Sequence, residues 1–526
     1  MCPPWTALAE ITPALRLSRA RRFPLRYDDF KSQLKIGTAT VVLMVMLRMG
    51  LGCHFLYEGV WKMTHPEFSA ESFLTMAKGP AAPIFHAMIY DIDGLKRLKI
   101  ERGISADSLL TQWRKVRDSS EERLVKDYVD RLKRYEAKKK KQKGELSAED
   151  RATVASLEKK IRSLTKPFQR GTEPILWKCE DQLDTFLKKN ERSMLAYFAT
   201  PSGERESSEK VEGWLKDLGR IQTEYVEQLT DFGKKDEAAR KAIVPSLDKL
   251  APVIDESKAV EELVAGNRLR NPKGDEILKV ADFTRAEKFY EPCKKLKAAV
   301  FAKYGLNDDQ KYHAEGTYRQ YKNAFKTLLA DNQDDIAVYF KALKRLEDHR
   351  AAGNNGAAHQ KQRLYDEKQK LRKEVGVWLK ELEASESGFQ DALAGMLTSQ
   401  QAARGALPVP WKRIDYINFA VTYGLTAIGL CLLLGLFTRP AALGGACFMI
   451  SVILTQPAWP TIVPHDPPVV GHALLINKDF IEMLALFMLA TTAVGRWAGL
   501  DYFVENYVVS LWGKLQNKSN PQEDKS

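Results

Sequence analysis

One apolar run near the N-terminus constrains the fold more than any other part of the chain. Residues Ile36 to Met63 are mostly Val, Leu, Met, Gly, Phe and Trp, and about 20 such residues cross the hydrocarbon core of a bilayer. Three ionisable residues, Arg48, His54 and Glu58, interrupt the run. A charge at the centre of a membrane helix costs about 2.5–3.5 kcal/mol on insertion scales and usually marks a pathway or a site. The run therefore predicts a membrane protein with polar groups inside the bilayer.

Three apolar segments near the C-terminus predict further spans, at about residues 416–437, 441–458 and 474–494. We expect a tight turn at Thr438 to Pro440 between the first two of these, because proline cannot continue the helix that precedes it. The segment before the first span carries seven basic residues against three acidic ones: Arg16, Arg19, Arg21, Arg22, Arg26, Lys31 and Lys35 against Glu10, Asp28 and Asp29. The positive-inside rule then places the N-terminus in the cytoplasm, and four crossings return the C-terminus there.

This topology predicts a multi-pass protein of the cell membrane. It divides the chain into a basic cytoplasmic N-terminus (1–35), a first span (36–63), an extracytoplasmic insertion (64–410), three further spans (within 411–503) and a polar cytoplasmic tail (504–526). The charges of the long insertion do not contradict this placement, because long domains cross the membrane largely regardless of their charge.

The insertion has a helical pattern. Apolar residues recur every three or four positions within 124–135, 154–164, 211–229 and 364–382, which is typical of amphipathic helices. The first two of these stretches predict an antiparallel hairpin, with a capping box at Ser147 to Asp150. We find no strand alternation, phosphate-binding loop, nucleophile motif or metal-ligand spacing. The predicted fold class is therefore all-α: a four-helix transmembrane bundle with a long insertion, either a compact bundle or an extended coiled coil.

Charge and cysteine content narrow the possible functions. The net charge is +13, but lysines alternate with glutamates along the predicted helices, which favours solvated helix faces over a nucleic-acid groove. Six cysteines without a C-x-x-C pair indicate neither a disulfide framework nor haem attachment nor a zinc ribbon. Cys179 and Cys293 are the only cysteines of the insertion, and they could pair in an oxidising compartment. We predict no metal site and no nucleic-acid partner.

Polar residues of several spans define a candidate site within the membrane. At a rise of 1.5 Å per residue, six of them fall in the outer half of the predicted bundle: His54, Glu58, Tyr423, Gln456, Asn477 and Glu482. A cavity lined by histidine and carboxylate could protonate a quinone headgroup or hold a small anion. The alternative is structural, with the same side chains forming hydrogen bonds between helices. Arg48 lies deeper, and its partner could be a helix-end carbonyl, a bound anion or a lipid phosphate.

Four motifs at span boundaries resemble the DoxX family of small membrane proteins. They are Arg48-x-x-x-Gly52-x-x-Phe55-x-x-x-Gly59-x-x-Lys62, the hairpin from Gly429 through Gly435 and Arg439 to Ala446, the segment Asn477 to Leu486 with Glu482, and Gly495-Arg-Trp-x-Gly-Leu-Asp501 after Ala490-Thr-Thr. The resemblance covers the two ends of the chain and none of the insertion. It implies a four-helix membrane bundle in a family that includes a subunit of thiosulfate:quinone oxidoreductase and accessory proteins of redox or sulfur stress.

Two hypotheses about function follow. The first is an accessory or quinone-linked subunit of a membrane system that oxidises sulfur or thiols, with a redox partner subunit and with quinone as the candidate cofactor. The second is a non-enzymatic membrane anchor whose helical insertion binds envelope partners. The sequence leaves open whether the chain is an enzyme, and a homo-oligomer is compatible with both hypotheses.

Overall fold

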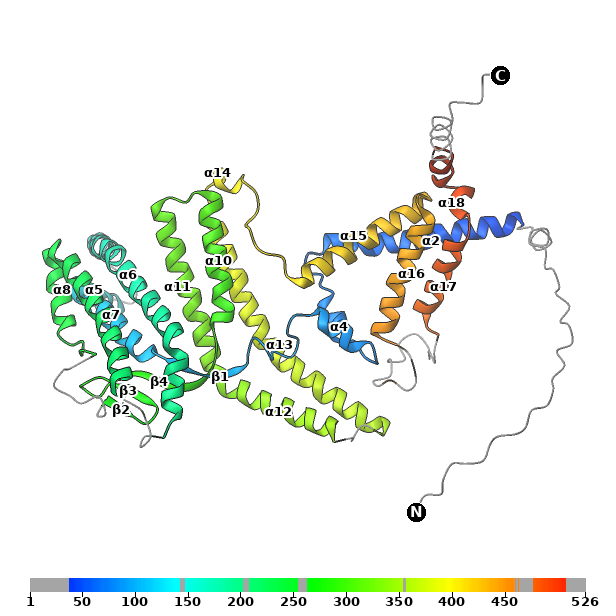
Figure 1. Cartoon of the computed structure of the whole chain (residues 1–526). Coiled ribbons are helices and arrows are strands. Elements are labelled where there is room, and N and C mark those ends of the chain that lie inside the picture. The colour runs from blue at the N-terminus through cyan, green and yellow to red at the C-terminus, as the bar shows by residue number, and fades with distance from the viewer. Residues whose placement is uncertain are drawn as a thin grey trace, which may run out of the picture. The chain divides into compact units, whose positions relative to one another are not determined.

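The structure is a computed structural model that describes residues 37–141, 147–201, 208–253, 263–352, 356–457, 459, 462 and 476–507. The chain is mostly helical, as predicted, and it forms two compact units (Figure 1). The membrane unit combines Met1–Tyr90 with Trp411–Ser526, and the insert unit is Asp91–Pro410. The predicted basic segment 1–35, the start of the predicted fourth span and most of the tail 504–526 lie outside the described residues.

The membrane unit contains three helices that are long and apolar enough to cross a membrane. They are α2 (Thr38–Thr64), α15 (Arg413–Leu434) and α16 (Thr438–Thr455). Near the predicted fourth span, α17 (Lys478–Thr491) has 14 residues and is followed by α18 (Val494–Trp497). α2 packs mainly against α15, and α16 packs mainly against α17.

The break between α15 and α16 lies a few residues before the predicted turn. α15 ends at Gly435, whose φ of 62° is left-handed, and Phe437 also has a left-handed φ, of 47°. Pro440 instead lies in the first turn of α16. Glycine takes the left-handed conformation at little cost, and proline is tolerated in a first turn because its missing N–H would have no partner there. The expectation of a turn at Thr438 to Pro440 is therefore wrong by about three residues.

Residues that follow the first span belong to the membrane unit and not to the insert unit. Two short helices occur here, α3 (Glu71–Thr75) and α4 (Ala82–Met88). The Ala70 N–H donates to Oδ1 of Asn418 over 2.9 Å. The Lys78 N–H donates to the Thr455 carbonyl, also over 2.9 Å. This segment is thus tied to α15 and to the C-terminal end of α16.

The insert unit consists of two groups of helices and one small sheet. The first group is α5 (Asp107–Lys141), α6 (Ala148–Ala199), α7 (Ser208–Lys234) and α8 (Glu237–Leu247); the second is α10 (Glu287–Tyr304), α11 (Asp308–Asp331), α12 (Gln333–Ala351) and α13 (Ala358–Gly395), followed by α14 (Ser399–Ala402). α5 and α6 pack as the predicted hairpin, and Oγ of Ser147 caps α6 by accepting the Asp150 N–H over 3.1 Å.

A four-stranded antiparallel sheet corrects the expectation of an insertion without strands. Its order is β1-β4-β3-β2, formed by β1 (Ile100–Ser105), β4 (Glu276–Thr284), β3 (Arg268–Arg270) and β2 (Val264–Ala265). β1 and β4 pair although α5 to α8 and the strands β2 and β3 lie between them in the sequence, with Ile100 opposite Thr284 and Ser105 opposite Lys279. Two of the strands are only two or three residues long, and the longest does not alternate regularly between buried and exposed positions. The sequence pattern on which strand prediction depends is therefore weak here.

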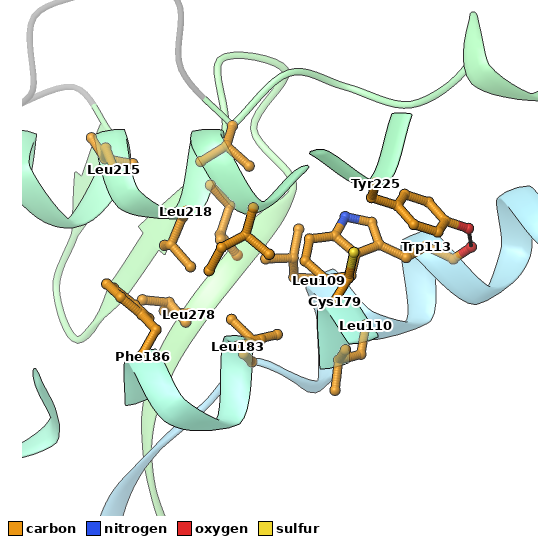
Figure 2. Close-up of a cluster of buried hydrophobic side chains, with 14 of the residues drawn as sticks. Leu109, Leu110, Trp113, Cys179, Leu183, Phe186, Leu215, Leu218, Tyr225 and Leu278 are labelled. Carbon is orange, nitrogen blue, oxygen red and sulfur yellow. Dashed lines mark hydrogen bonds between the residues drawn. The ribbon is translucent and has the colours of Figure 1, made fainter. Parts of the chain in front are cut away.

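Two separate apolar clusters form the core of the insert unit. The first lies among α5, α6, α7, α8 and the sheet, where the Trp113 and Tyr225 rings stack with centroids 5.6 Å apart and the Tyr225 hydroxyl donates to the Trp113 carbonyl (Figure 2). The second lies among α10 to α13. Cys179 belongs to the first cluster and Cys293 to the second, and they are not bonded to each other. The disulfide that the sequence left possible is therefore not formed in this structure. Burial raises the pKa of the Cys179 thiol to about 12.

Candidate functional site

Arg48 is buried at one end of the membrane unit, where it binds backbone carbonyls. The residue is 1% exposed. Its Nη1 donates to the Val494 carbonyl over 3.2 Å and its Nη2 to the Ala498 carbonyl over 2.8 Å. Of the three partners that the sequence left open, the structure therefore has the helix-end carbonyl. An arginine has five N–H donors in a planar fork, which allows this side chain to join the first helix to the segment that follows α17.

Glycines make room for the Arg48 guanidinium. A Cβ at Gly435 would overlap its Nη1, and a Cβ at Gly499 would lie 2.7 Å from the same atom. Gly435 also accepts the Asp501 N–H over 2.8 Å, and the Asp501 carboxylate accepts the Thr438 N–H at the start of α16 over 3.0 Å. A carboxylate is favourable at a helix N-terminus. We call Arg48, Gly435, Thr438, Gly499 and Asp501 the arginine clasp.

The clasp brings together residues from three motifs that lie far apart along the chain. Arg48 comes from the first motif, Gly435 from the hairpin motif, and Gly499 and Asp501 from the last one. Sequence reasoning quoted these residues without recognising that they meet, and it did not consider Asp501 or Thr438 as site residues. The sequence does carry one signal for these residues, because two glycines precede a single aspartate just after the last apolar segment.

Other glycines bring the backbones of α2 and α15 together. A Cβ at Gly59 would overlap Thr426, a Cβ at Gly429 would overlap the backbone of Leu56, and a Cβ at Gly52 would lie 2.7 Å from the Leu433 nitrogen. Small residues that allow close backbone approach are the usual means of association between membrane helices. These motif glycines therefore have a packing role in the structure.

His54 and Glu482 form the second polar centre of the membrane unit. The His54 Nε2 lies 3.8 Å from the Glu482 Oε1, so this contact joins α2 to α17. The His54 side chain is 57% exposed and that of Glu482 is 18% exposed. The Glu482 Oε1 is buried and has no hydrogen-bond partner among the described residues. His54 follows Arg48 by six positions, which places the two centres about 9 Å apart along α2.

The remaining residues of the predicted site do not join this pair. Glu58 forms an ion pair with Lys62 of the same helix, with Nζ and Oε2 2.5 Å apart. Tyr423 is exposed, and its ring centroid lies 4.5 Å from that of Phe419. Gln456 follows the end of α16, where its N–H donates to the Val452 carbonyl. Asn477 caps α17, because its Oδ1 accepts the Phe480 N–H over 2.9 Å.

The predicted seven-residue site is therefore two centres and several isolated residues. His54 and Glu482, which the sequence predicted to share a site, do lie close together. The other residues were assigned to the site by their predicted depth alone, and an equal depth does not bring residues on different helix faces into contact. Chemically, an imidazole beside a carboxylate can hold and transfer a proton. Within the described residues, no group of three His, Cys, Asp or Glu side chains is placed to hold a metal ion.

Comparisons of the chain with protein-family models, with curated proteins and with solved structures find no match.

Proposed function

We propose that this chain is a DoxX-like integral membrane protein and an accessory, quinone-linked subunit of a membrane redox system. The observation that carries the proposal is the 3.8 Å contact between His54 and Glu482, two residues that come from opposite ends of the sequence and from two of the motifs that resemble the family. A titratable pair on two apolar helices is costly to keep in a membrane, and such pairs commonly serve proton transfer or ligand binding.

The proposed architecture is a four-helix membrane bundle. α17 would be the core of the fourth span: its 14 residues reach about 21 Å at 1.5 Å per residue, so flanking apolar residues would complete the crossing of the hydrocarbon core. With the N-terminus in the cytoplasm, the arginine clasp lies towards the cytoplasmic side and the His54–Glu482 pair towards the outer side. The insert unit is then extracytoplasmic.

The proposed chemistry is proton supply to a reducible headgroup. Reduction of a quinone to a quinol consumes two electrons and two protons. The electrons would come from a partner subunit that oxidises a sulfur compound or a thiol. The imidazolium form of His54, stabilised by the neighbouring Glu482 carboxylate, would donate one proton to a quinone oxygen. The same imidazole, protonated again from water, would supply the second proton to the other oxygen.

Quinone binding tests this proposal directly. We would titrate the purified full chain in detergent with decylubiquinone, then repeat the titration with His54→Ala and Glu482→Gln. We expect each substitution to weaken binding about ten-fold, the loss of one hydrogen bond to a charged group. Glu505→Gln is the control, because this exposed carboxylate of the same unit is paired with Arg496. No binding, or equal affinity in all four proteins, would exclude a quinone site at this pair.

A second function, a non-enzymatic membrane anchor for envelope partners, is supported by the arginine clasp. Arg48 is the most unexpected residue of the first span, yet its Nη1 and Nη2 both bind backbone carbonyls of the same unit. This use is structural. If quinone fails to bind, cross-linking through the insert unit would test the anchor: recovery of one reproducible envelope partner supports it, and recovery of none contradicts it.

A further inference from the structure

The insert unit is divided into two lobes. The first lobe is α5 to α8 with the cluster around Trp113, and the second lobe is α10 to α13 with the cluster around Phe325. The helix pairs that pack most extensively in this unit, such as α5–α6, α7–α8, α11–α13 and α12–α13, each lie within one lobe. Figure 1 shows the same grouping.

Charged side chains fill much of the boundary between the lobes. Arg319 of α11 is 7% exposed and reaches α6, where its Nη2 lies 2.6 Å from the Asp181 Oδ2 and its Nη1 lies 3.3 Å from the Glu180 Oε2. One turn further along, Lys322 Nζ lies 2.5 Å from the Asp184 Oδ2. We call these pairs the ionic seam. Charged groups regain hydration when such a surface opens, so separating the lobes costs less than exposing either apolar cluster.

The strands β1 and β4 connect the two lobes. Leu98, just before β1, belongs to the second cluster, whereas Ile104 at its other end belongs to the first. Leu278 of β4 belongs to the first cluster, and Ala286, just after the strand, belongs to the second. Two paired strands that pass from one lobe to the other form a natural hinge.

A cavity of about 400 Å³ lies beside this hinge. Leu110 and Leu187 of the first lobe line it together with Leu329 and Tyr290 of the second, and Ala281 and Phe283 of β4 also contribute. Small-molecule sites of this size commonly lie between domains and combine apolar walls with a few polar groups.

One ion pair at this cavity is longer than the pairs around it. The Lys326 Nζ lies 3.4 Å from the Asp107 Oδ1, whereas the Arg285 Nη2 and the Glu191 Oε1, which also line the cavity, are 2.9 Å apart. The Asp107 side chain is 68% exposed and that of Lys326 is 34% exposed. A long ion pair between partly exposed side chains contributes little to stability, so a ligand can exchange with it at low cost.

We propose that this cleft is a binding site for α-amino acids with apolar side chains. An α-amino acid carries its ammonium and its carboxylate on adjacent carbons. Asp107 and Lys326 present the complementary charges side by side, one from each lobe, so the ammonium binds Asp107 and the carboxylate binds Lys326. The side chain of the ligand contacts Phe283 and Leu329. Because one ligand bridges both lobes, its binding holds the hinge closed. This inference is independent of the quinone proposal.

Equilibrium dialysis of the full chain tests this site. We would dialyse the protein in detergent against an equimolar mixture of the twenty amino acids and identify the retained compounds by mass spectrometry. We expect enrichment of one or more apolar members. Asp107→Asn and Lys326→Gln should each weaken binding about ten-fold, since each removes one charge-assisted contact. Both side chains are exposed enough for the substitutions to leave the fold intact.

The control variant is Lys241→Gln, which removes an exposed lysine paired with Glu237 on α8. It should leave the retained amount unchanged. A second control uses the retained amino acid with its amine acetylated and its carboxylate amidated, which should not bind. Absence of enrichment, equal enrichment in the cleft variants, or equal binding of the blocked analogue would each overturn the proposal.

Discussion

The two units of this chain bury polar groups in different ways. In the membrane unit, the buried Arg48 binds backbone carbonyls, and glycines allow the helices to approach closely. In the insert unit, the buried Arg319 binds carboxylates: Asp181 and Glu180 across the lobe boundary, and Glu315 on its own helix over 2.8 Å. Carboxylates therefore neutralise the charge of Arg319, whereas the dipoles of backbone carbonyls stabilise the charge of Arg48.

The difference follows from the surroundings of each unit. In the membrane unit, one arginine with several donors serves the carbonyls of Val494 and Ala498, and Asp501 of the clasp places a negative charge nearby. In the insert unit, the Asp181 side chain at the edge of the ionic seam is 53% exposed, so solvent also stabilises its charge. The same residue type thus serves helix packing in one unit and reversible contact between lobes in the other.

The largest effect is expected from removing the arginine of the ionic seam. Arg319→Met removes a partner of the buried Glu180 and of the partly exposed Glu315, and breaking a buried pair in this way costs about 3–5 kcal/mol. Hydrogen exchange of the full chain, measured by mass spectrometry, should show faster exchange in α6 and α11 and unchanged exchange in α2 and α15. Arg220→Met, at an exposed position of α7, should have no comparable effect.

Next in size is the effect of a single added methyl group between the membrane helices. In Gly429→Ala, the Cβ overlaps the Leu56 backbone, which cannot move as a side chain can, so we expect a loss of about 3 kcal/mol. Gly424→Ala lies on the same helix with no atom within 4 Å of its Cβ. It should be neutral or slightly stabilising. Thermal unfolding in detergent measures both, and equal stability of the two variants would contradict the packing described for α2 and α15.

A smaller effect is expected from opening the arginine clasp. Arg48→Met removes the donors from the Val494 and Ala498 carbonyls, which should cost about 2 kcal/mol. Arg48→Lys should recover part of this loss. Limited proteolysis should cut the segment after α17 sooner in Arg48→Met than in Arg496→Met, which removes an exposed cation. Equal cleavage rates would show that the clasp does not hold this segment.

The smallest effect is a dependence of the insert unit on acid pH. Burial would raise the pKa of Glu315, but hydrogen bonds and charges from Lys297 and Arg319 lower it below its usual value. A carboxyl with a depressed pKa in the folded state adds stability above its unfolded pKa, about 4.3, and loses it as pH falls through the folded pKa. The protection of α10 and α11 against exchange, relative to the intrinsic exchange rate at each pH, should therefore fall as the pH drops below about 4. Glu315→Gln should flatten this dependence, and an unchanged profile would contradict it.

Local patterns predicted much of the fold correctly. The apolar runs located α2, α15 and α16 to within a few residues, and the heptad-like spacing located the α5–α6 hairpin. The sheet could not be predicted, because β1 and β4 are separated by four helices and owe their pairing to contacts that no local window contains. The proposed cysteine pair failed for the same reason, since sequence separation does not reveal that the insert unit has two cores.

The sequence by itself determined which helices are long and apolar enough to cross a membrane and which are amphipathic, because hydropathy and period are properties of neighbouring residues. It also singled out Arg48, His54, Glu482 and the motif glycines. Only the tertiary structure decided what these residues contact: Arg48 meets carbonyls from the other end of the chain, His54 meets Glu482, and Glu58 turns to Lys62. The reason is geometric, since contacts between helices depend on the face and the rotation of each helix, which long-range packing fixes.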